Sequence, residues 1–553
     1  MTSLVQPVDW LAVGPPLVVA LTAVAALVAS VVAPATAIRR GLVTWLSLGG
    51  LVVALLLLLP LLGTTRSVFC APDSRGAGEA CSYVVDTTTL VFQLVAAGGA
   101  ALVVLLSATA TWTAAEPARP ETSSTDAEVS VDGGTSAGHL PTGEYHFLLL
   151  ASAAGAMTIA GARDLVTLVV ALELVSLPAF ALVGLRRDRR SAEAALKFFL
   201  VSVVSVAVML LGVSLVYGVT GAVHFDRIAA ALASESTAAG ESRLTGVAAV
   251  GVVLTLVGLA FKVSAVPFHF WVPDTYVGAP VAVAAYLSVV SKGAGLVGLL
   301  LVVSLAFPSY AGVWSPIVGV LAAVTVTVGN LVALRQQTAV RLLAWSSIAQ
   351  AGYLLVPLGA VSAVTGSGGV TSAGGRSADV AEVLAATVAY LLIYAVLNLG
   401  AFGVVTSVIG SGTGAEGRGV RLEDYRGMIR RDPARAVALA FFLLALAGLP
   451  PGVAGLFAKV VIFRAAVESG AGWLAVVVAV NVVIGLAYYL PWTARLFMPA
   501  VGTAPSTDAD HGRRVPWPAM LAIGVTAVLG IVLSVAPGVA LDVLPQLPLA
   551  LSR

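Results

Sequence analysis

The sequence has little charge for its length. Only 10% of its 553 residues are Asp, Glu, Lys or Arg, whereas about a quarter of the residues of a typical soluble domain are charged. Hydrophobic residues make up 59% of the chain, and the mean hydropathy is +1.00. This composition excludes a soluble globular protein. The net charge of only +2 also argues against nucleic-acid binding.

Cysteine is also scarce. The two cysteines, Cys70 and Cys81, share one polar loop, and the sequence contains no CxxC pair or histidine cluster. It therefore offers no ligand set for a metal ion or an iron–sulfur cluster. The spacing permits a disulfide if the loop faces an oxidising compartment, and two unpaired thiols fit it equally well.

Long apolar runs, in contrast, recur along the whole chain. Most have 18 or more residues, enough to cross roughly 30 Å of hydrocarbon. We therefore predict an all-α, polytopic integral membrane protein of about fourteen transmembrane helices. The predicted spans are residues 11–36, 41–63, 88–112, 145–161, 165–185, 194–219, 246–266, 279–307, 313–334, 339–360, 383–409, 435–467, 472–498 and 516–537.

Arginine-rich loops alternate with arginine-poor loops between these spans. Arg39, Arg186–Arg190 and Arg418–Arg435 all fall on one side of the predicted membrane. The positive-inside rule makes the arginine-rich side cytoplasmic. Both termini and the loop with the two cysteines are then predicted to face outward.

Loops of low complexity divide the chain. Residues 113–141 are acidic and rich in Ser, Thr, Pro and Gly, a composition typical of disorder. The predicted division is three N-terminal transmembrane helices (1–112), a disordered cytoplasmic connector (113–141), a first half (142–310), a second half (311–500), and a C-terminal helix with a tail (501–553).

The placement of lysine is the most informative feature. The chain has only four lysines and all lie inside apolar segments, whereas nearly every arginine lies in or beside a polar loop. Arginine is effectively always protonated, but a lysine in a low-dielectric site can lose its proton near neutral pH. Helices that take up and release protons would therefore use lysine and exclude arginine. The four residues are Lys197, Lys262, Lys292 and Lys459.

One carboxylate accompanies the lysines. Glu173 is the only acid in its apolar segment, where an unpaired charge is expensive, so we expect a basic partner. Lys197, on the next predicted helix, is the first candidate and Lys262 the second. Lys197 is close enough to an arginine-rich loop to extend its ammonium to the membrane interface. Taken singly, each lysine also fits a structural ion pair.

Two of the predicted helices are interrupted next to a lysine. Proline and glycine free backbone carbonyls at membrane depth, and paired interruptions in two halves of a transporter mark an ion path. The pattern predicts two inverted five-helix repeats with broken helices. His269, in the first interruption, is a further candidate relay group, and a structural histidine fits the position equally well. The interrupting residues are Pro267, Pro273 and Pro280 after Lys262, and Gly448, Pro450, Pro451 and Gly452 before Lys459.

The segments that contain these residues resemble one family. Together they are similar to the antiporter-like, proton-translocating subunits of respiratory NADH:quinone oxidoreductase (complex I), over roughly residues 144–500. Lysine rather than glutamate at position 459 resembles the N-type subunits. The motifs, in order, are ARDLVTLVVALELVSLPAFALVG (162–184), EAALKFF (193–199), FKVSAVPFHFWVPDTYVGAP (261–280), YLSVVSK (286–292), VRLLAWSSIAQAGY (340–353), EDYRGM (423–428) and LPPGVAGLFAKVVIF (449–463).

The resemblance implies a role for each buried charge. Glu173 and Lys197 would sense events in an adjacent subunit, Lys262 and Lys292 would be the central lysines of a cytoplasmic half-channel, and Lys459 would feed the outer half-channel. The chain would be one subunit of a bacterial plasma-membrane translocase, surrounded by lipid, a neighbouring antiporter-like subunit and small membrane subunits. It would bind no cofactor and have no redox site of its own. NAD, FMN, iron–sulfur clusters and quinone would belong to partner subunits.

Three other functions remain open at this point. The motifs are also similar to subunits of multi-subunit sodium/proton antiporters and of membrane-bound hydrogenases. A structural scaffold that binds quinone is an alternative from a different class. Retention of coupled proton transport after exchange of Lys262 or Lys459 for Met would favour the scaffold.

Overall fold

The structure of the protein is a computed structural model. It describes residues 8–33, 37–71, 80–111, 140–237, 243–366, 373–409, 420–499 and 515–538. The predicted connector at 113–141, except for its last two residues, and most of the predicted tail at 501–553 lie outside the described residues.

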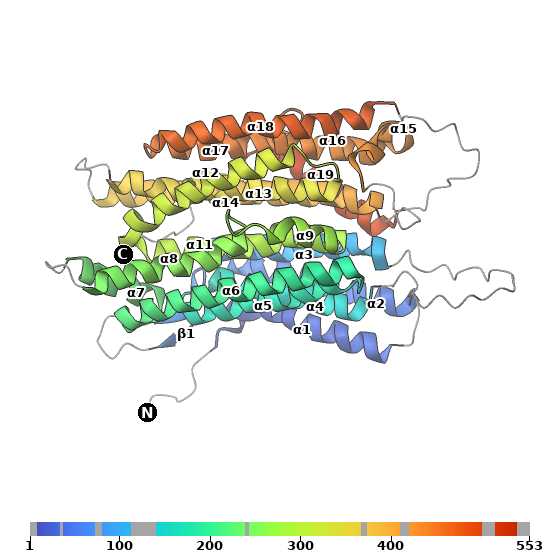
Figure 1. The fold of residues 1–553 in the computed structure, drawn as a ribbon. Helices are drawn as coiled ribbons and strands as arrows, with labels where there is room; N and C mark the ends of the chain where they lie inside the picture. Colours follow the sequence, from blue (N-terminus) through green and yellow to red (C-terminus); the bar gives the residue numbers. More distant parts are fainter. Residues whose placement is uncertain are drawn as a thin grey trace, which may run out of the picture.

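Long helices lie side by side with roughly parallel axes (Figure 1). This arrangement suits a bilayer, because a helix satisfies its backbone hydrogen bonds within itself. Within the described ranges, twelve helical spans are long and apolar enough to cross a membrane. They are α1 (Trp10–Val32), α2 (Ala37–Leu58), α3 (Thr87–Thr111), α5 (Leu165–Gly184), α6 (Arg189–Thr220), α8 (Arg243–Val263), a composite rod (Val281–Ala306), α12 (Ala311–Ala333), α13 (Ala339–Gly366), α14 (Ala373–Ile409), α18 (Gly472–Phe497) and α19 (Trp517–Val535).

The two remaining predicted spans are also present as helices. One is α4 (Thr142–Gly161), whose first turns contain the polar residues Glu144 and His146. The other is broken into α16 (Pro433–Ala447) and α17 (Ala454–Glu468), each only 15 residues long. The predicted all-α, polytopic membrane fold is confirmed, and each predicted span corresponds to a helix or a broken helix.

Each half of the chain contains five helical members, and the fourth member is broken. The first half has α4, α5, α6, the broken pair α8 and α9 (Trp271–Gly278), and the composite rod. The second half has α12, α13, α14, the broken pair α16 and α17, and α18. In Figure 1 the pair α8–α9 runs from left to right and α16–α17 runs from right to left. The two broken helices thus have opposite directions, as an inverted repeat requires.

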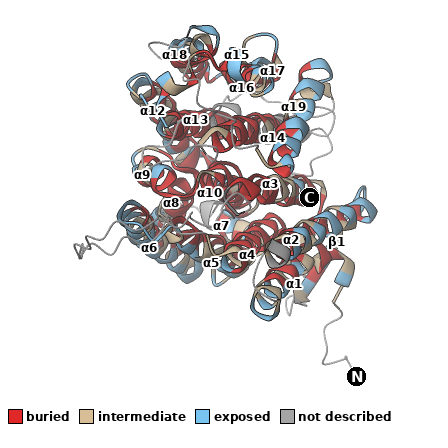
Figure 2. Ribbon diagram, turned by 90° about the vertical axis from the view of Figure 1, so that its right-hand side faces the viewer, coloured by how far each residue is buried: buried red, intermediate tan, exposed pale blue. Residues whose placement is uncertain are grey.

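The composite rod is almost completely buried. It consists of α10 (Val281–Tyr286), a π-helical segment η2 (Leu287–Ser291), α11 (Lys292–Leu301) and a second π-helical segment η3 (Val302–Ala306). Figure 2 shows α10, α13 and α14 in the interior. The outer helices expose apolar side chains instead, as a lipid-facing surface does, among them Leu21, Val53, Val204, Val320, Val483 and Val528.

Short elements cover the two ends of the helices. One end, which we call the hairpin end, has the antiparallel strands β1 (Arg66–Ala71) and β2 (Ala80–Val85) and the helix α7 (Phe225–Thr237). The opposite end, which we call the arginine-rich end, has η5 (Leu422–Tyr425) and α15 (Met428–Arg431). Short 3₁₀ turns η1 (Leu59–Leu61) and η4 (Pro308–Tyr310) complete the fold.

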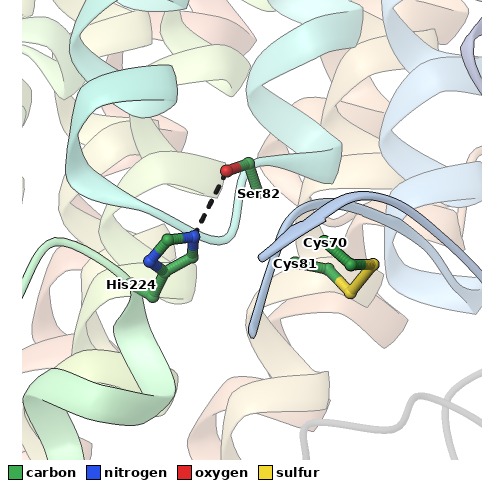
Figure 3. Close-up of a disulfide and its surroundings, with 4 residues drawn as sticks. All are labelled: Cys70, Cys81, Ser82 and His224. Atoms are coloured by element: carbon green, nitrogen blue, oxygen red, sulfur yellow. Dashed lines mark hydrogen bonds between the residues drawn. A yellow bond between two sulfur atoms is a disulfide. The ribbon is translucent and has the colours of Figure 1, made fainter. Parts of the chain in front are cut away.

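Cys70 and Cys81 lie opposite each other in the hairpin and form a disulfide (Figure 3). The sequence left this pairing open. The Ser82 hydroxyl next to it lies 3.3 Å from Nε2 of His224, just before α7, and the backbone amide of Arg163 donates to the Ser82 carbonyl. The hairpin is therefore attached to the ends of the first-half helices.

Candidate functional site

Three of the four lysines are buried. Lys262, Lys292 and Lys459 are 3%, 2% and 6% exposed, whereas the Lys197 side chain is 48% exposed. Among the described residues, these three are the only buried lysines or arginines. Burial of a charged amine is costly unless it finds hydrogen-bond partners, so their contacts define the candidate site.

Lys262 lies in the last turn of α8, directly before the first break. Its Nζ donates a hydrogen bond to Ser176 Oγ of α5 at 2.8 Å. Ser176 follows Glu173 by three residues, so both face the same side of α5. The charge of Lys262 also acts electrostatically on Glu173. Lys262, the second candidate partner of Glu173, thus interacts with it electrostatically.

The predicted pairing of Glu173 with Lys197 is wrong. Lys197 Nζ forms ion pairs with Glu193 at 2.7 Å and with Asp274 at 3.0 Å. Glu193 is one helical turn earlier on α6, and Asp274 lies on α9, so two nearer carboxylates take its charge. Glu173 forms no ion pair with any described residue, and its buried Oε1 has no hydrogen-bond partner among them.

Lys262 also approaches the helix that begins with Lys292. A Cβ added to Gly295 of α11 would lie 2.7 Å from Lys262 Cβ and 2.8 Å from its Cγ. Glycine at this position therefore leaves the room that the Lys262 side chain occupies. Since Gly295 is one turn after Lys292, the two lysines reach adjacent turns of α11.

Lys292 connects the two halves. It directly follows the π-helical segment η2, a local irregularity that often occurs at functional sites. Its Nζ donates to the backbone oxygen and to Oγ of Ser347, both at 2.9 Å. Ser347 belongs to α13, so the amine of a first-half lysine is held by a second-half helix.

Lys459 lies near the start of α17, just after the second break. Its Nζ donates to the carbonyl oxygens of Leu446 at 2.8 Å and Ala447 at 2.6 Å, at the end of α16. These carbonyls are available because the last turn of a helix leaves its acceptors without helical partners. The amine also lies 5.9 Å from the centroid of the Tyr353 ring, within cation–π range.

The ammonium positions in the two halves share one physical feature. Lys262 is in the last turn of α8, and Lys459 reaches the last carbonyls of α16. The C-terminal end of a helix has a partial negative charge that stabilises a cation. The acceptors of all three buried amines are neutral hydroxyls or carbonyls, and among the described residues no carboxylate accepts a hydrogen bond from them. Neutral acceptors of this kind can hold either an ammonium or a neutral amine.

His269 lies in the first break, and its ring is 5.4 Å from the ring of Trp345 on α13. No hydrogen bond joins it to Lys262 or Lys292 in the described structure. Its role in a relay stays a prediction.

Sequence reasoning missed the groups that hold the lysines. Ser176 and Ser347 are ordinary-looking hydroxyls, and the carbonyls of Leu446 and Ala447 have no sequence signal beyond the nearby prolines. The described residues also contain no group of three or more His, Cys, Asp or Glu side chains that could hold a metal ion.

Comparison with known proteins identifies the family. Residues 162–485 match the family described as "NADH:quinone oxidoreductase/Mrp antiporter, TM". The chain is 52% identical to NADH-quinone oxidoreductase subunit N 2 of Streptomyces griseus, over 97% of this chain and 93% of the relative. It is 45% identical to NADH-quinone oxidoreductase subunit N of Salinispora tropica, over 90% of this chain and 86% of the relative.

Solved structures agree with this result. A chain of respiratory complex I from Thermus thermophilus with bound aureothin superposes with a TM-score of 0.70 at 30% identity, covering 96% of this chain and 99% of that chain. A chain of the Mrp complex from Dietzia sp. shares the fold, with a TM-score of 0.74 at 20% identity over 97% of this chain and 96% of that chain. The resemblance inferred from the motifs is confirmed: the chain belongs to the NADH:quinone oxidoreductase/Mrp antiporter family, and the two relatives at 52% and 45% identity are N subunits of NADH-quinone oxidoreductase.

Proposed function

We propose that this chain is a proton-translocating membrane subunit of an NADH:quinone oxidoreductase, in which Lys262, Lys292 and Lys459 pass protons along the membrane interior. The main support is the chain of contacts at the site. The buried amines follow one another from a first-half break, through α11 and α13, to a second-half break, and each has neutral acceptors. The names of the relatives supply the identity of the complex.

Glu173 supplies the controlling charge in this proposal. Its carboxylate acts on Lys262 electrostatically and has no ion-pair partner among the described residues. A change in the charge near Glu173 would therefore alter how readily Lys262 holds its proton. Lys197 is exposed and paired with two carboxylates, so in this proposal it has a secondary influence on the charge around Glu173. His269, in the first break, is an auxiliary proton-transfer group.

The proposed functional units follow the halves of the chain. Residues 142–310 hold the entry side of the relay and residues 311–500 hold the exit side. Residues 1–112 and the C-terminal helix within 501–553 lie outside the two halves and complete the membrane-embedded body.

The redox reaction belongs to partner subunits in this proposal. NAD, FMN, iron–sulfur clusters and quinone would be bound there, and this chain would be a translocase subunit without a redox site. A neighbouring membrane subunit would cover the flank of α5 beside Glu173, where Val166, Val170, Leu174 and Leu177 expose apolar side chains.

We further propose that the chain lies in a bacterial plasma membrane with its arginine-rich end in the cytoplasm and both termini outward. The positive-inside rule supports this orientation. The disulfide at the hairpin end supports it independently, because disulfides persist in oxidising compartments. A membrane-impermeant thiol reagent, applied to intact cells after reduction, should label Cys70 and Cys81. Labelling only in inside-out vesicles would show that the protein has the opposite orientation.

The function is tested with the assembled complex in inside-out membrane vesicles. Lys262→Met should abolish proton uptake driven by NADH, because Met keeps the length of the side chain and cannot accept a proton. Lys197→Met is a matched control at an exposed lysine and should lower uptake far less. Normal uptake in Lys262→Met would refute the relay and favour a scaffold. Proton transport driven by a sodium gradient and independent of NADH would favour an antiporter subunit.

A further inference from the structure

The buried rod of the first half is not a regular α-helix where it reaches Lys292. The π-helical segment η2 ends on the lysine itself, because the Lys292 backbone N–H donates to the carbonyl of Leu287, five residues earlier. A π turn of this kind inserts one extra residue into an α-helix. Since each residue of an α-helix adds about 100° of rotation, the π turn decides in which direction the Lys292 side chain leaves the rod.

Two side chains of α14 hold this π turn at Ser288. Asn398 Nδ2 donates to the Ser288 hydroxyl at 2.7 Å, and the Tyr394 hydroxyl donates to the Ser288 carbonyl at 3.0 Å. Asn398 follows Tyr394 by one helical turn, so both lie on one face of α14. The Ser288 hydroxyl donates in turn to the Ala285 carbonyl at 2.8 Å. A helix of the second half therefore binds both the side chain and the main chain of Ser288.

The amide of Asn398 is only half satisfied. Asn398 is completely buried, and its Oδ1 has no hydrogen-bond partner among the described residues. A buried polar atom without a partner is costly, so its presence calls for an explanation. The contact that Asn398 does make, from Nδ2 to Ser288, is the feature that a purely apolar side chain could not replace.

Packing shapes the rest of the surroundings of η2. The Tyr286 hydroxyl, just before the π turn, donates to Ser152 Oγ of α4 at 2.9 Å. A Cβ added to Gly99 of α3 would lie 2.8 Å from Cγ2 of Val290, so glycine leaves the room that the π turn occupies. Figure 2 shows α3, α10 and α14 as neighbours in the interior. The π turn therefore has a fitted site in the bundle.

The second π-helical segment of the rod, η3, provides a comparison. Its buried Ser304 donates to the Leu300 carbonyl of its own helix at 2.6 Å. In the part of the chain that the structure describes, no hydrogen bond joins Ser304 to another helix. No lysine follows η3. The η2 turn differs in both respects, since it is held from the second half and ends at a lysine of the relay.

The contact at Ser288 and the contact at Lys292 lie close together. Ser288 precedes Lys292 by four residues, so the two are neighbours along the rod. The Lys292 amine is accepted by Ser347 of α13, the helix that packs beside α14. The second half thus binds the π turn with one helix and accepts the lysine with the next.

We propose that Asn398 and Tyr394 are positioning residues for proton transfer at Lys292. They hold η2 in its π-helical form and thereby direct the amine of Lys292 to Ser347. Without them, η2 can return to α-helical hydrogen bonding, which would rotate Lys292 by about 100° relative to the first part of the rod. This inference rests on the proposed function, because it requires Lys292 to be a group of the relay.

The test uses the assembled complex in inside-out vesicles and measures proton uptake and NADH oxidation in the same sample. Ser288→Ala removes the acceptor of Asn398 and should lower proton uptake per NADH about fivefold, which corresponds to about 1 kcal/mol, the contribution of one hydrogen bond. Ser288→Thr keeps the hydroxyl and should restore most of the uptake. Ser304→Ala, the matched control in η3, should pump normally.

A cryo-EM map of the Ser288→Ala complex tests the geometry directly. We expect α-helical hydrogen bonding across residues 287–291 and a Lys292 amine that has left Ser347. A map in which the π turn and the Lys292–Ser347 contact are unchanged would overturn the proposal. A loss of uptake in Ser304→Ala or in Ser288→Thr equal to that in Ser288→Ala would overturn it as well.

A second variant covers the case in which Ser288→Ala does not assemble. Tyr394→Phe removes one oxygen, keeps the ring and should lower the same ratio; a normal ratio would then overturn the proposal. Lys292→Met separates this inference from the relay. Normal pumping by Lys292→Met refutes a relay through this lysine. Loss of pumping in Lys292→Met beside normal pumping by Ser288→Ala, or by Tyr394→Phe in its place, refutes only the positioning role.

Discussion

The two broken helices hold their lysines in different ways. In the first half, Lys262 is fixed by a side chain, the Ser176 hydroxyl of a neighbouring helix. In the second half, Lys459 is fixed by the main chain, through the carbonyls of Leu446 and Ala447 at the end of its own broken helix. Both amines sit at the C-terminal end of a half-helix, where the helix dipole favours a cation.

The difference indicates which changes would disturb the lysine contacts in each half. The acceptor of Lys262 is a single side-chain hydroxyl, which a substitution at Ser176 can remove or restore. Glu173, one helical turn from Ser176, also interacts electrostatically with Lys262. The carbonyl acceptors belong to the backbone, so the geometry of the second break must stay intact for Lys459 to be held. We therefore expect proton transfer at Lys262 to respond to changes of charge nearby. Proton transfer at Lys459 should depend instead on the backbone geometry of the second break.

The strongest test of this comparison is a pair of glycine substitutions. In Gly455→Ala, the new Cβ would overlap the backbone carbonyl oxygen of Ala445, so the backbone of α16 or α17 would have to shift. We expect a loss of about 3 kcal/mol of stability and failure of the membrane arm to assemble. Gly295→Ala meets Lys262 Cβ at 2.7 Å, a less severe overlap, so it should cost less stability, still assemble in part and show reduced proton uptake. Native gels and vesicle assays distinguish the two outcomes; equal assembly would remove the contrast.

The next effect concerns the lysines themselves. Lys459→Met leaves two buried carbonyls without their donor, at a cost of about 1–3 kcal/mol. Lys262→Met leaves Ser176, whose hydroxyl already donates to the Leu172 carbonyl, so the cost should be smaller. Both should abolish pumping, but only Lys459→Met should clearly lower the thermal midpoint of the purified complex. Identical midpoints would show that the carbonyl contacts do not stabilise the break.

A smaller effect is expected where charge alone changes. Glu173→Gln keeps the shape of the side chain and removes the negative charge that acts on Lys262. Proton uptake per NADH should fall about tenfold, equivalent to a barrier increase of roughly 1.4 kcal/mol. In Lys197→Met, proton uptake per NADH should fall far less, because Lys197 and its carboxylate partners are exposed. Equal and negligible losses in both variants would argue against control by Glu173.

The smallest expected effect is at the arginine-rich end of the second half. Arg495 and Arg426 bind Glu423 at 2.8 Å and 3.2 Å and hold the pKa of its carboxyl below the usual range. Since the pKa is lower in the folded state, this contribution to stability is present at neutral pH and is lost as the pH falls through the folded pKa. It should be small, because the Glu423 side chain is 56% exposed. A thermal-midpoint titration should show a slightly flatter acid limb for Glu423→Gln, and an unchanged limb would mean that the pairs contribute nothing.

Much of the fold followed from the sequence. Apolar length and spacing predicted the transmembrane spans, and the prolines and glycines beside Lys262 and Lys459 predicted the two broken helices. Motif resemblance identified the family. These features are local, because length, hydrophobicity and helix-breaking residues act within one segment.

The partners of the buried charges could not be predicted in the same way. Glu173 and Lys197 lie on consecutive helices, yet Lys197 turns to Glu193 and Asp274. The cysteine pairing stayed open, since spacing alone does not fix the distance between two thiols. The motif at 340–353 contributed to the resemblance, but only the packing of α13 against α14 and α18 assigns partners to Gln350.

The sequence by itself determined that this protein is a membrane-embedded helical bundle with a few deeply placed amines. The tertiary structure alone decided which atoms those amines contact. The physical reason is that depth along a helix depends on residue count, a property of one segment. Contact between helices depends on how each is rotated and tilted against its neighbours, a property of the whole packed molecule.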